Sequence, residues 1–479
     1  MVERPRFGTE GWRGIIAEDF TFAAVRRVSQ ALALELRERV SGANEAPALV
    51  VGFDTRFGSD RFATAVAEVL AAHDIHVYLC KGPTPSQVVS HAVVEAGASG
   101  GVLITASHNP AQFNGIKIKG RSGAPASFDF LHALERRYMQ LAGEGPEPPR
   151  RALKAAEDDG NLDRIAPLNA YRDHLAQLVD LDGLRAAGLT IVVDAMYGAG
   201  AGILPGLLAE GTTKVIEING TANPLFPNLR GPEPIAVNLT RLMRVVQDGN
   251  SSLGLALDGD ADRIGVVGPG GSYVNGQTLF ALLALYLLEV RGWNGPIIKS
   301  LSGTAMIDAL GEHFGAPVHE TPVGFTAMAP VFREHDAILA GEESGGFAFR
   351  HHVPERDGIL SGLFLLDFLV RRETDLAGAI AALEARVGKW YSERLDIPCR
   401  FDQCDTVMER IRGAGVKRLA GVPITRVNDA DGLKYYLEDG SWLLLRFSGT
   451  EPIMRLYAEA RAPERVGDLL TRGRELSGL

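Results

Sequence analysis

The segment ALVVGFDTRFGSDRFATAVAEVLAAHDIHVYLC, residues 48–80, decides the fold class. The apolar run Ala48–Phe53 predicts a strand, Ser59 is the expected cap of a helix that reaches about residue 72, and His76–Cys80 predicts a second strand. A further helix and a third strand over residues 101–105 complete a βαβαβ unit. Such a unit is typical of an open parallel sheet with crossover helices.

The same plan recurs along the chain. Strands are expected at residues 189–194, 214–218 and 253–257, and a third round of helices and strands begins near Gly276. From about Lys389 onward, short strand patterns at residues 424–427, 433–437, 442–447 and 453–458 and a final helix indicate a smaller α+β domain.

The predicted fold is therefore three consecutive α/β domains with mixed, mainly parallel sheets, plus a smaller C-terminal α+β domain. The expected domains are residues 1–160, 161–265, 266–387 and 388–479.

Composition limits the classes of function. The chain has 479 residues, of which 46% are hydrophobic and 23% charged, and its net charge is −10. A general nucleic-acid or membrane-surface binder would carry a basic excess. No apolar run approaches the roughly 18 residues of a spanning helix, and the first residues lack the apolar region of a secretory signal. Cys80, Cys399 and Cys404 show no metal-binding spacing, so we expect a cytoplasmic protein in a reducing compartment.

A polar loop follows the third predicted strand. Residues 105–117 read TASHNPAQFNGIK and hold a hydroxyl at Ser107, an imidazole at His108 and an ammonium at Lys117. Ligand-binding residues of open α/β sheets lie beyond the carboxyl ends of strands. A serine can carry a transferred group when a cation or metal supports the charge. The same residue types are common in ordinary turns, so the loop by itself leaves both interpretations open.

Three carboxylates at alternate positions follow another apolar strand. The sequence LDGDADR places Asp258, Asp260 and Asp262 together, where like charges raise one another's pKa. A hard divalent cation such as Mg²⁺ removes that repulsion. A calcium loop would need glycine at its sixth position and glutamate at its twelfth. Arg263 and Pro269 stand there, which excludes it. The Arg263 guanidinium suits phosphate oxygens, and the alternative for the motif is an acidic turn in solvent.

Two glycine-rich motifs are weaker taken singly. GEESGG, residues 341–346, sets two carboxylates where they could orient sugar hydroxyls, although a charged turn is the more common interpretation. FGTEGWRG, residues 7–14, combines glycines that allow a ligand to approach the backbone with the side chain of Arg13. Its alternative is a flexible arm, and its spacing is not that of a P-loop.

The last motif, near the end of the chain, has the residues of a phosphate-binding nest. RFSGTEP combines Arg446, Ser448 and Thr450 with the turn at Gly449, so that side chains and backbone N–H groups can point at one anion. Arg455, further on, either adds charge or lies on a strand face.

Taken in the order in which they occur along the chain, from Phe7 to Arg455, these five motifs resemble those of the α-D-phosphohexomutase superfamily, the phosphoglucomutases and phosphomannomutases. The resemblance covers nearly the whole chain. The resemblance implies a phosphosugar mutase in which Ser107 is phosphorylated in the resting enzyme. The phosphoserine would convert a hexose monophosphate into a hexose 1,6-bisphosphate and take back the other phosphate.

The resemblance also implies roles for particular residues. One Mg²⁺ per active site would be held by Asp258, Asp260, Asp262 and the phosphoserine at Ser107. Catalytic cations would be Lys117, Arg263 and Arg13, with His108 orienting the loop. Sugar contacts would come from Glu342, Ser344, His352, Arg356 and, in the loop TPVGF, Thr321, Val323 and Gly324. The phosphate that is not transferred would bind Arg446, Ser448, Gly449, Thr450 and Arg455.

Two departures bear on the substrate. Gly346 stands where many bacterial phosphomannomutase/phosphoglucomutases have histidine, and HVPERDG from His352 resembles the HIREKDG of phosphoglucomutases, with Arg356 in place of lysine. We therefore expect glucose 1-phosphate and glucose 6-phosphate as substrates, with mannose phosphates open, and glucose 1,6-bisphosphate as activator. The general acid/base stays open between Lys117, His352 and a phosphate oxygen, with His108 as a weaker candidate.

Two other classes of function compete with the mutase. A metal-dependent sugar-phosphate phosphatase would not need a second phosphate nest, and a non-catalytic phosphosugar-binding protein would not need Ser107. The expected partner is a phosphorylated hexose, neither nucleic acid nor membrane, and the expected state is a monomer or homodimer.

Overall fold

The structure is a computed structural model that describes residues 5–8, 11–39, 47–142, 146–449 and 452–479. The chain divides into two compact units. Unit 1 comprises Met1–Gly276 and Ser344–Ala377, and unit 2 comprises Gln277–Glu343 and Gly378–Leu479. In the part of the chain that is described, no helix combines the length and the apolar character needed to cross a membrane.

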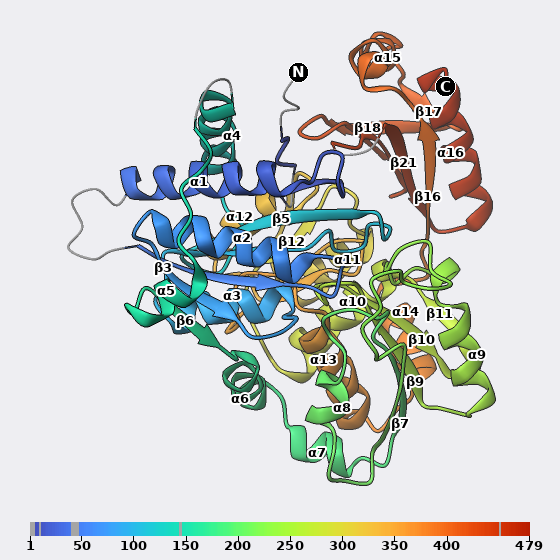
Figure 1. The fold of residues 1–479 in the computed structure, drawn as a ribbon. Helices are drawn as coiled ribbons and strands as arrows, with labels where there is room; N and C mark the ends of the chain where they lie inside the picture. Colours follow the sequence, from blue (N-terminus) through green and yellow to red (C-terminus); the bar gives the residue numbers. More distant parts are fainter. Residues whose placement is uncertain (1–4, 9–10, 40–46, 143–145, 450–451) are drawn as a thin grey trace. The chain divides into compact units, whose positions relative to one another are not determined.

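The first sheet of unit 1 contains the predicted βαβαβ core and adds antiparallel strands at one edge (Figure 1). The strand order is β1-β5-β4-β2-β3-β6. The strands are β1 (Trp12–Ile15), β2 (Ala48–Phe53), β3 (His76–Cys80), β4 (Gly100–Ile104), β5 (Phe113–Gly120) and β6 (Leu162–Ile165), and the helices are α1 (Phe22–Arg39), α2 (Ser59–Ala72), α3 (Ser86–Glu95), α4 (Phe128–Ala142), α5 (Leu153–Asp158) and α6 (Leu168–Leu178). Strands β4, β2, β3 and β6 are parallel, whereas β5 is antiparallel to β4 and to β1.

Alternate side chains of β2 are buried on opposite faces of this sheet. Leu49 and Val51 join one core with residues of α1 and α2, and Val50 joins a second core with residues of α3. A strand covered by helices on both faces needs apolar residues at every position, which explains why β2 has a continuous apolar run.

Two local expectations are wrong. Residues 105–117 do not form one loop, because β5 begins at Phe113 and places Lys117 within a strand, opposite Leu103 of β4. The cap of α2 is Gly58, which adopts φ 73, rather than Ser59. The Ser59 hydroxyl instead donates a hydrogen bond of 2.7 Å to Asp54 Oδ1, so it supports the turn that follows β2.

The second sheet of unit 1 has the order β11-β10-β9-β7-β8. Its elements are β7 (Thr190–Asp194), β8 (Lys214–Ile218), β9 (Leu253–Leu257), β10 (Ile264–Gly268), β11 (Ser272–Val274), α7 (Leu181–Ala186), α8 (Ile203–Leu207) and α9 (Thr240–Asp248). Strands β9, β7 and β8 are parallel, and β10 and β11 complete an antiparallel edge. The returning segment contains β15 (Phe347–Phe349), which is not a strand of this sheet, and α13 (Gly358–Arg371), which packs on β9 and β10.

In unit 2, the strands β13, β12 and β14 lie in this order within a third sheet and are parallel to one another. Its elements are β12 (Ile297–Ser300), β13 (Val318–Thr321), β14 (Leu339–Gly341), α10 (Gly276–Leu285), the π-helical turn Tyr286–Val290, α11 (Ala305–Phe314), α12 (Phe325–Glu334) and α14 (Leu376–Val387).

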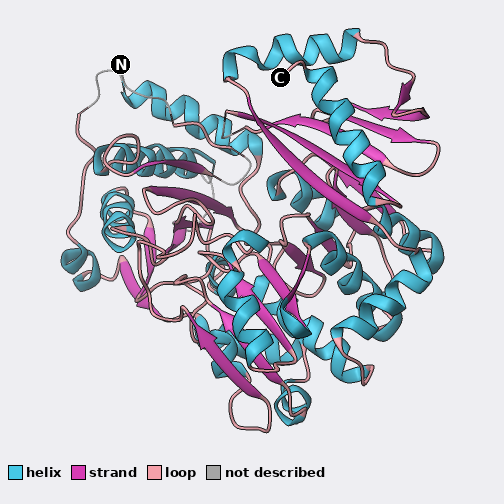
Figure 2. Cartoon of the chain, turned by 90° about the vertical axis from the view of Figure 1, so that its right-hand side faces the viewer, coloured by secondary structure: helices cyan, strands magenta, loops and turns pink. Residues whose placement is uncertain are grey.

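The last part of unit 2 is an antiparallel half-barrel with two helices (Figure 2). The strand order is β16-β21-β20-β19-β18-β17. The elements are β16 (Tyr391–Pro398), β17 (Arg418–Leu419), β18 (Val422–Asn428), β19 (Leu433–Leu437), β20 (Trp442–Phe447), β21 (Ile453–Ala460), α15 (Cys404–Gly413) and α16 (Pro463–Ser477). The sequence pattern did not predict β16, because this edge strand reads YSERLDIP and carries charges that weaken its apolar periodicity.

Candidate active site

The Ser107 hydroxyl meets the predicted metal-binding loop. Ser107 follows β4 of the first sheet, and its Oγ donates a hydrogen bond of 2.8 Å to Oδ2 of Asp258, which follows β9 of the second sheet. Both residues are fully buried, and His108 Nδ1 lies 3.3 Å from the same hydroxyl. The Ser107 motif and the aspartate motif, whose contacting residues are 151 positions apart in the sequence, therefore lie together.

Ser107 sits in a constrained backbone. Its φ of 50° is in the left-handed region, which residues other than glycine adopt rarely. The Ser107 N–H donates to Thr105 Oγ1 at 2.8 Å, and the Thr105 hydroxyl donates to Asp54 Oδ2 at 2.6 Å. This chain of hydrogen bonds ties the unusual conformation to the end of β2.

Arg56 was not predicted to belong to the site, yet its buried guanidinium organises the loop. It donates to the carbonyl oxygens of Ser107 and Asn109, at 2.6 Å and 2.5 Å, and to those of Pro110 and Phe113. Burial lowers the pKa of Arg56, and the neighbouring Asp54 carboxylate, 3.3 Å away, counters that effect. Its signal in the sequence was its place just beyond the carboxyl end of a parallel strand.

A glycine permits the close approach of the two loops. A Cβ atom at Gly259 would lie 2.4 Å from the Ser107 carbonyl oxygen, closer than any packed side chain tolerates. The DGD sequence therefore needs glycine between the first two aspartates for Ser107 to reach Asp258.

The aspartate cluster fits a divalent cation. Among the described residues, Asp258, Asp260 and Asp262 form a group in which one carboxylate oxygen from each lies within 4.8 Å of the others, and all three are fully buried. Asp260 Oδ1 is buried without a hydrogen-bond partner. Burial, followed by the charges of Asp262 and Asp260, raises the pKa of Asp258 well above its usual value. A hard cation would take the orphaned oxygen and relieve the repulsion.

Two cationic side chains already contact this cluster. The Lys117 ammonium donates to Asp260 Oδ2 and Asp262 Oδ2, at 2.7 Å each, and Arg356 Nη2 donates to Asp262 Oδ2 at 2.6 Å. Burial raises the pKa of Asp260, but the charge of Lys117, the hydrogen bonds with Lys117 and Asp258 and the charge of Arg356 together leave the pKa below its usual value. Such a set of cations around a hydroxyl suits the transfer of an anionic group.

Two other predicted cations of unit 1, Arg13 and Arg263, contact residues of the Ser107 loop and of the aspartate loop. Arg13, on β1, donates from Nη1 to Asn109 Oδ1 at 2.5 Å, two residues beyond Ser107. Arg263 directly follows the cluster. Its backbone N–H donates to Asp258 Oδ1 at 3.0 Å, and its guanidinium lies 3.8 Å from Glu233 Oε1.

The glycine at position 346, where many bacterial relatives have histidine, is explained by steric crowding. A Cβ atom there would lie 2.4 Å from Arg356 Cδ, so the Arg356 side chain occupies the space that a larger residue would need. His352 is not exposed in the way that a side chain binding substrate from the surface would be. Its side chain is fully buried, with Nε2 2.9 Å from Asp357 Oδ2 and Nδ1 3.0 Å from His174 Nε2.

The sugar-loop candidates of unit 2 are held by two carboxylates. The Val323 N–H donates to Asp431 Oδ2, and the Gly324 N–H donates to Glu342 Oε1, at 2.9 Å each. Thr321 ends β13, and its hydroxyl donates to the carbonyl of Pro322. In unit 1, the Ser344 Oγ is buried without a hydrogen-bond partner.

The predicted phosphate nest brings two arginines face to face. Arg446 on β20 and Arg455 on β21 are directly opposite each other in the antiparallel register, an arrangement that repels unless an anion lies nearby. Asp431 Oδ2 accepts a hydrogen bond of 2.7 Å from Arg446 Nε. Ser448 is buried and Gly449 exposed, whereas Thr450 lies outside the described residues.

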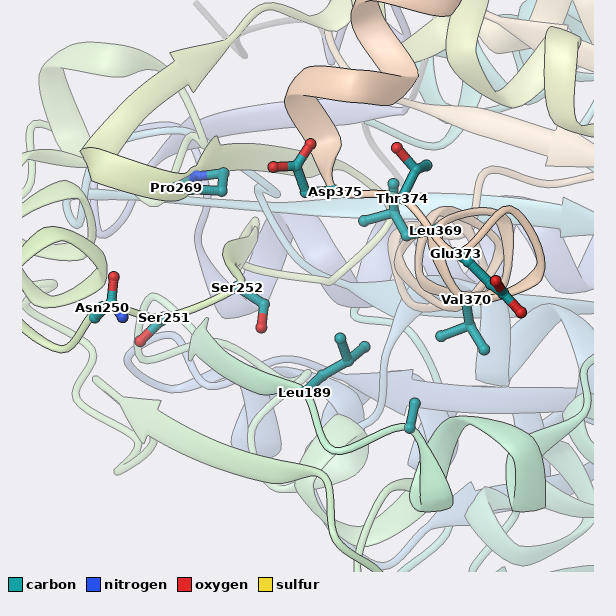
Figure 3. Close-up of a pocket in the computed structure, with 11 residues that line it drawn as sticks. Leu189, Asn250, Ser251, Ser252, Pro269, Leu369, Val370, Glu373, Thr374 and Asp375 are labelled. Atoms are coloured by element: carbon teal, nitrogen blue, oxygen red, sulfur yellow. The ribbon is translucent and has the colours of Figure 1, made fainter.

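A separate cavity of about 650 Å³ lies in unit 1 (Figure 3). Leu189, Ser251 and Ser252, which line it, precede β7 and β9. The aspartate cluster follows β9, so the cavity is at the opposite end of the strand and is not the site described above.

Family models match the chain in four successive parts. They are described as phosphoglucomutase/phosphomannomutase α/β/α domain I over residues 4–142, domain II over residues 169–271, domain III over residues 275–387, and the C-terminal domain over residues 401–475.

Whole-length relatives agree. A phosphoglucomutase/phosphomannomutase of Thermococcus kodakarensis is 30% identical over 476 residues, covering 98% of both chains. A probable phosphoglucosamine mutase of Pyrococcus horikoshii is 31% identical over 470 residues, covering 98% of this chain and 97% of the relative. The crystal structure of a candidate phosphomannomutase from Thermus thermophilus superposes with a TM-score of 0.85 at 36% identity, covering 100% of both chains.

Four domain models in the expected order, full-length relatives and a buried serine–aspartate site agree with one another. The chain therefore belongs to the phosphoglucomutase/phosphomannomutase superfamily of α-D-phosphohexomutases and is an isomerase-class intramolecular phosphotransferase.

Proposed function

We propose that this phosphohexomutase interconverts glucose 1-phosphate and glucose 6-phosphate, with Ser107 as the carrier of the phosphoryl group. The contact of 2.8 Å between Ser107 Oγ and Asp258 Oδ2 carries the proposal. The hydroxyl contacts one of three clustered carboxylates, and the Lys117 ammonium binds the other two, so it is placed to give and take an anionic group once a cation joins them.

The proposed cycle transfers the phosphoryl group twice. The Ser107 Oγ–phosphorus bond breaks, a bond from the sugar hydroxyl oxygen to phosphorus forms, and the hydroxyl proton leaves to a base. The resulting glucose 1,6-bisphosphate then gives its other phosphoryl group to Ser107, and a proton returns to the sugar oxygen that is released. Uncatalysed phosphate-ester reactions are extremely slow, so positioning and charge stabilisation must supply nearly all of the acceleration.

Asp258, Asp260 and Asp262, with a phosphoserine oxygen, would hold Mg²⁺, which supplies positive charge beside the transferring group. Lys117, together with Asp258 and Arg356, lowers the pKa of Asp260, which favours the ionised form that binds a cation. The Arg263 and Arg13 guanidiniums are proposed to meet phosphate oxygens, and His108 to orient the Ser107 hydroxyl. Lys117 and a phosphate oxygen remain the proposed acid/base groups, because the His352 ring is engaged with Asp357 and His174.

Other residues are proposed to hold the substrate. Glu342, Ser344 and the loop of Thr321, Val323 and Gly324 would contact sugar hydroxyls, and the unpartnered Ser344 Oγ supports this. Arg356 would contact the sugar or its phosphate from its place beside Asp262. The phosphate that is not transferred would bind Arg446, Ser448, Gly449, Thr450 and Arg455, and the opposed pair Arg446 and Arg455 supports an anion there.

The GEES sequence and Gly346 favour glucose phosphates, while the names of the relatives include phosphomannomutase and phosphoglucosamine mutase. The deciding experiment measures turnover of glucose 1-phosphate, mannose 1-phosphate and glucosamine 1-phosphate with Mg²⁺ and the matching bisphosphate. We expect the highest kcat/KM for glucose 1-phosphate. Faster turnover of either other sugar would reassign the substrate, and release of inorganic phosphate in place of isomer would favour a phosphatase.

The carrier role has its own test. Intact-mass analysis should find one phosphoryl group on the wild-type protein, and Ser107→Ala should lose both that group and at least a thousandfold of kcat. Ser29→Ala is the matched control, because Ser29 is a buried serine of α1 whose hydroxyl donates only to the Val25 carbonyl. An active Ser107→Ala protein would reject the carrier.

A further inference from the structure

We propose that Gln87 and Asp357 are a positioning pair that shapes the loop of residues 258–262 for the cation. The inference rests on the proposed function, since it takes this loop to be the Mg²⁺ site, but it assigns roles to two residues that contact neither cation nor substrate.

The bend of the loop is at Ala261, between two proposed ligands. Ala261 is fully buried and adopts φ 60, a left-handed conformation that costs an L-residue about 1–2 kcal/mol. This bend places the carboxylates of Asp260 and Asp262 on the same side. A conformation of this kind persists only where neighbours hold it.

Donors from two helices hold the bend. The Ala261 carbonyl accepts hydrogen bonds from Gln87 Nε2 at 3.0 Å and from the Gly358 N–H at 3.1 Å. The Asp260 carbonyl accepts a further bond of 3.0 Å from the Ser86 N–H. The starts of α3 and α13 therefore meet on this one turn, and Gln87 supplies the side-chain contact.

Asp357 sets the orientation of the Gln87 amide. Gln87 Nε2 also donates to Asp357 Oδ1 at 3.3 Å. With one acceptor on each side, the amide must present its NH₂ group to both. Hydrogen bonds at both carboxylate oxygens fix the Asp357 side chain. Its Oδ1 caps α13 by accepting from the Leu360 N–H, and its Oδ2 accepts from the Tyr171 hydroxyl at 2.7 Å.

The buried histidine of the HVPERDG motif belongs to this support. His352 Nε2 donates to Asp357 Oδ2 at 2.9 Å, because a carboxylate oxygen only accepts. The other ring nitrogen, Nδ1, lies 3.0 Å from His174 Nε2. His352 thus acts on the site through Asp357 and Gln87.

The test measures Mn²⁺ binding to the full-length protein by calorimetry, with Gln87→Met as the variant. Met keeps the length of the side chain and removes the donor. Substitution of residues that support metal ligands typically costs 10–100-fold in affinity, so we expect binding about tenfold weaker. Activity at saturating substrate should be restored by raising Mg²⁺, which a general loss of structure would not allow.

Two further variants keep the result interpretable. Gln277→Met is the matched control, because this buried glutamine also makes two hydrogen bonds, to the Ser302 carbonyl and from the Thr304 N–H, within unit 2. It should bind Mn²⁺ like the wild type. Tyr171→Phe removes one donor to Asp357 and should weaken binding by about threefold, the worth of one ordinary hydrogen bond.

The results separate a failure of the positioning pair from a failure of the metal site. Wild-type affinity in Gln87→Met and Tyr171→Phe, or equal losses in Gln87→Met and Gln277→Met, would overturn the positioning pair and leave the proposed function intact. If Asp260→Asn binds Mn²⁺ as the wild type does, the metal site itself fails, and the inference fails with it.

Discussion

The Arg56 guanidinium donates a hydrogen bond of 2.6 Å to the carbonyl oxygen of Ser107. It also binds the Asn109 carbonyl and lies over the ring of Phe226, with 4.9 Å from the guanidinium carbon to the ring centroid. A single buried cation therefore holds the loop of the proposed phosphoryl carrier.

Arg56→Lys should lower kcat by about a hundredfold, because a displacement of roughly 1 Å in a reacting group has that effect. A lysine cannot satisfy four carbonyl oxygens from one ammonium. The melting temperature should fall by several degrees, since buried acceptors left unpaired cost about 1–3 kcal/mol each. Steady-state kinetics and thermal unfolding check this. Arg61→Lys, an exposed arginine of α2, is the control, and wild-type kcat in Arg56→Lys would contradict the prediction.

Lys117→Met should make stability depend more strongly on Mg²⁺. Without the ammonium, the buried Asp260 and Asp262 lose a partner that lies 2.7 Å from each. Removal of one member of a buried ion pair costs about 3–5 kcal/mol. We expect a large drop of the melting temperature in EDTA and a greater recovery with Mg²⁺ than the wild type shows.

Lys119→Met is the matched control for that experiment. Lys119 is a buried lysine on the same strand, paired with Glu355 and Ser86 rather than with the aspartate cluster. It should lose stability without gaining a Mg²⁺ response. Equal Mg²⁺ responses in the two variants would show that Lys117 does not compensate the cluster.

Asp431→Asn should lower the KM for glucose 1-phosphate by about threefold, because a partly exposed ion pair is worth at most about 1 kcal/mol. The Asp431 carboxylate neutralises part of the Arg446 charge and also accepts from the Val323 N–H. Asparagine keeps the shape and removes the competing anion. Asp429→Asn, an exposed neighbour, makes the same change of charge and should leave KM unaltered. An unchanged or raised KM in Asp431→Asn would mean that Asp431 does not compete with the substrate phosphate.

Acidification should destabilise unit 1 through His91. Burial, with the nearby His174 and His352, lowers the pKa of His91 to about 4. The unfolded chain, with a pKa near 6.5, binds more protons between these values. The contribution of the uncharged His91 ring to the free energy of unfolding is therefore complete above about pH 6.5 and is lost as the pH falls toward 4.

Thermal unfolding of the wild type and His91→Gln at pH 7.5 and pH 5 tests this. The wild type should lose about 1–2 kcal/mol more than the variant on acidification, after allowance for partial solvent screening. His132→Gln, an exposed histidine of α4, should behave like the wild type. Equal pH dependence in all three proteins would exclude His91 as the cause.

The sequence by itself determined the alternation of strands and helices and the motifs that follow the strands. The bounds of β2, β3, β8, β9, β19 and β20 agree with the apolar runs of the sequence. Apolar periodicity is a property of adjacent residues, so it can be read from the chain directly. The aspartate triad was equally local as a candidate cation site, although the alternative of an acidic turn in solvent was excluded only by the burial of all three side chains.

Tertiary structure decided which residues meet. Ser107 and Asp258 are 151 positions apart, and Gln87 and Asp357 are 270 apart. Contacts of this kind depend on how two sheets bring their strand ends together. Gln87 and Asp431 carry no local pattern that marks them, and Arg56 is marked only by its place just beyond the carboxyl end of β2. Lys117 contacts the triad because β5 runs back along β4. The chemistry of a buried side chain is set by its neighbours in space, and local sequence does not contain that information.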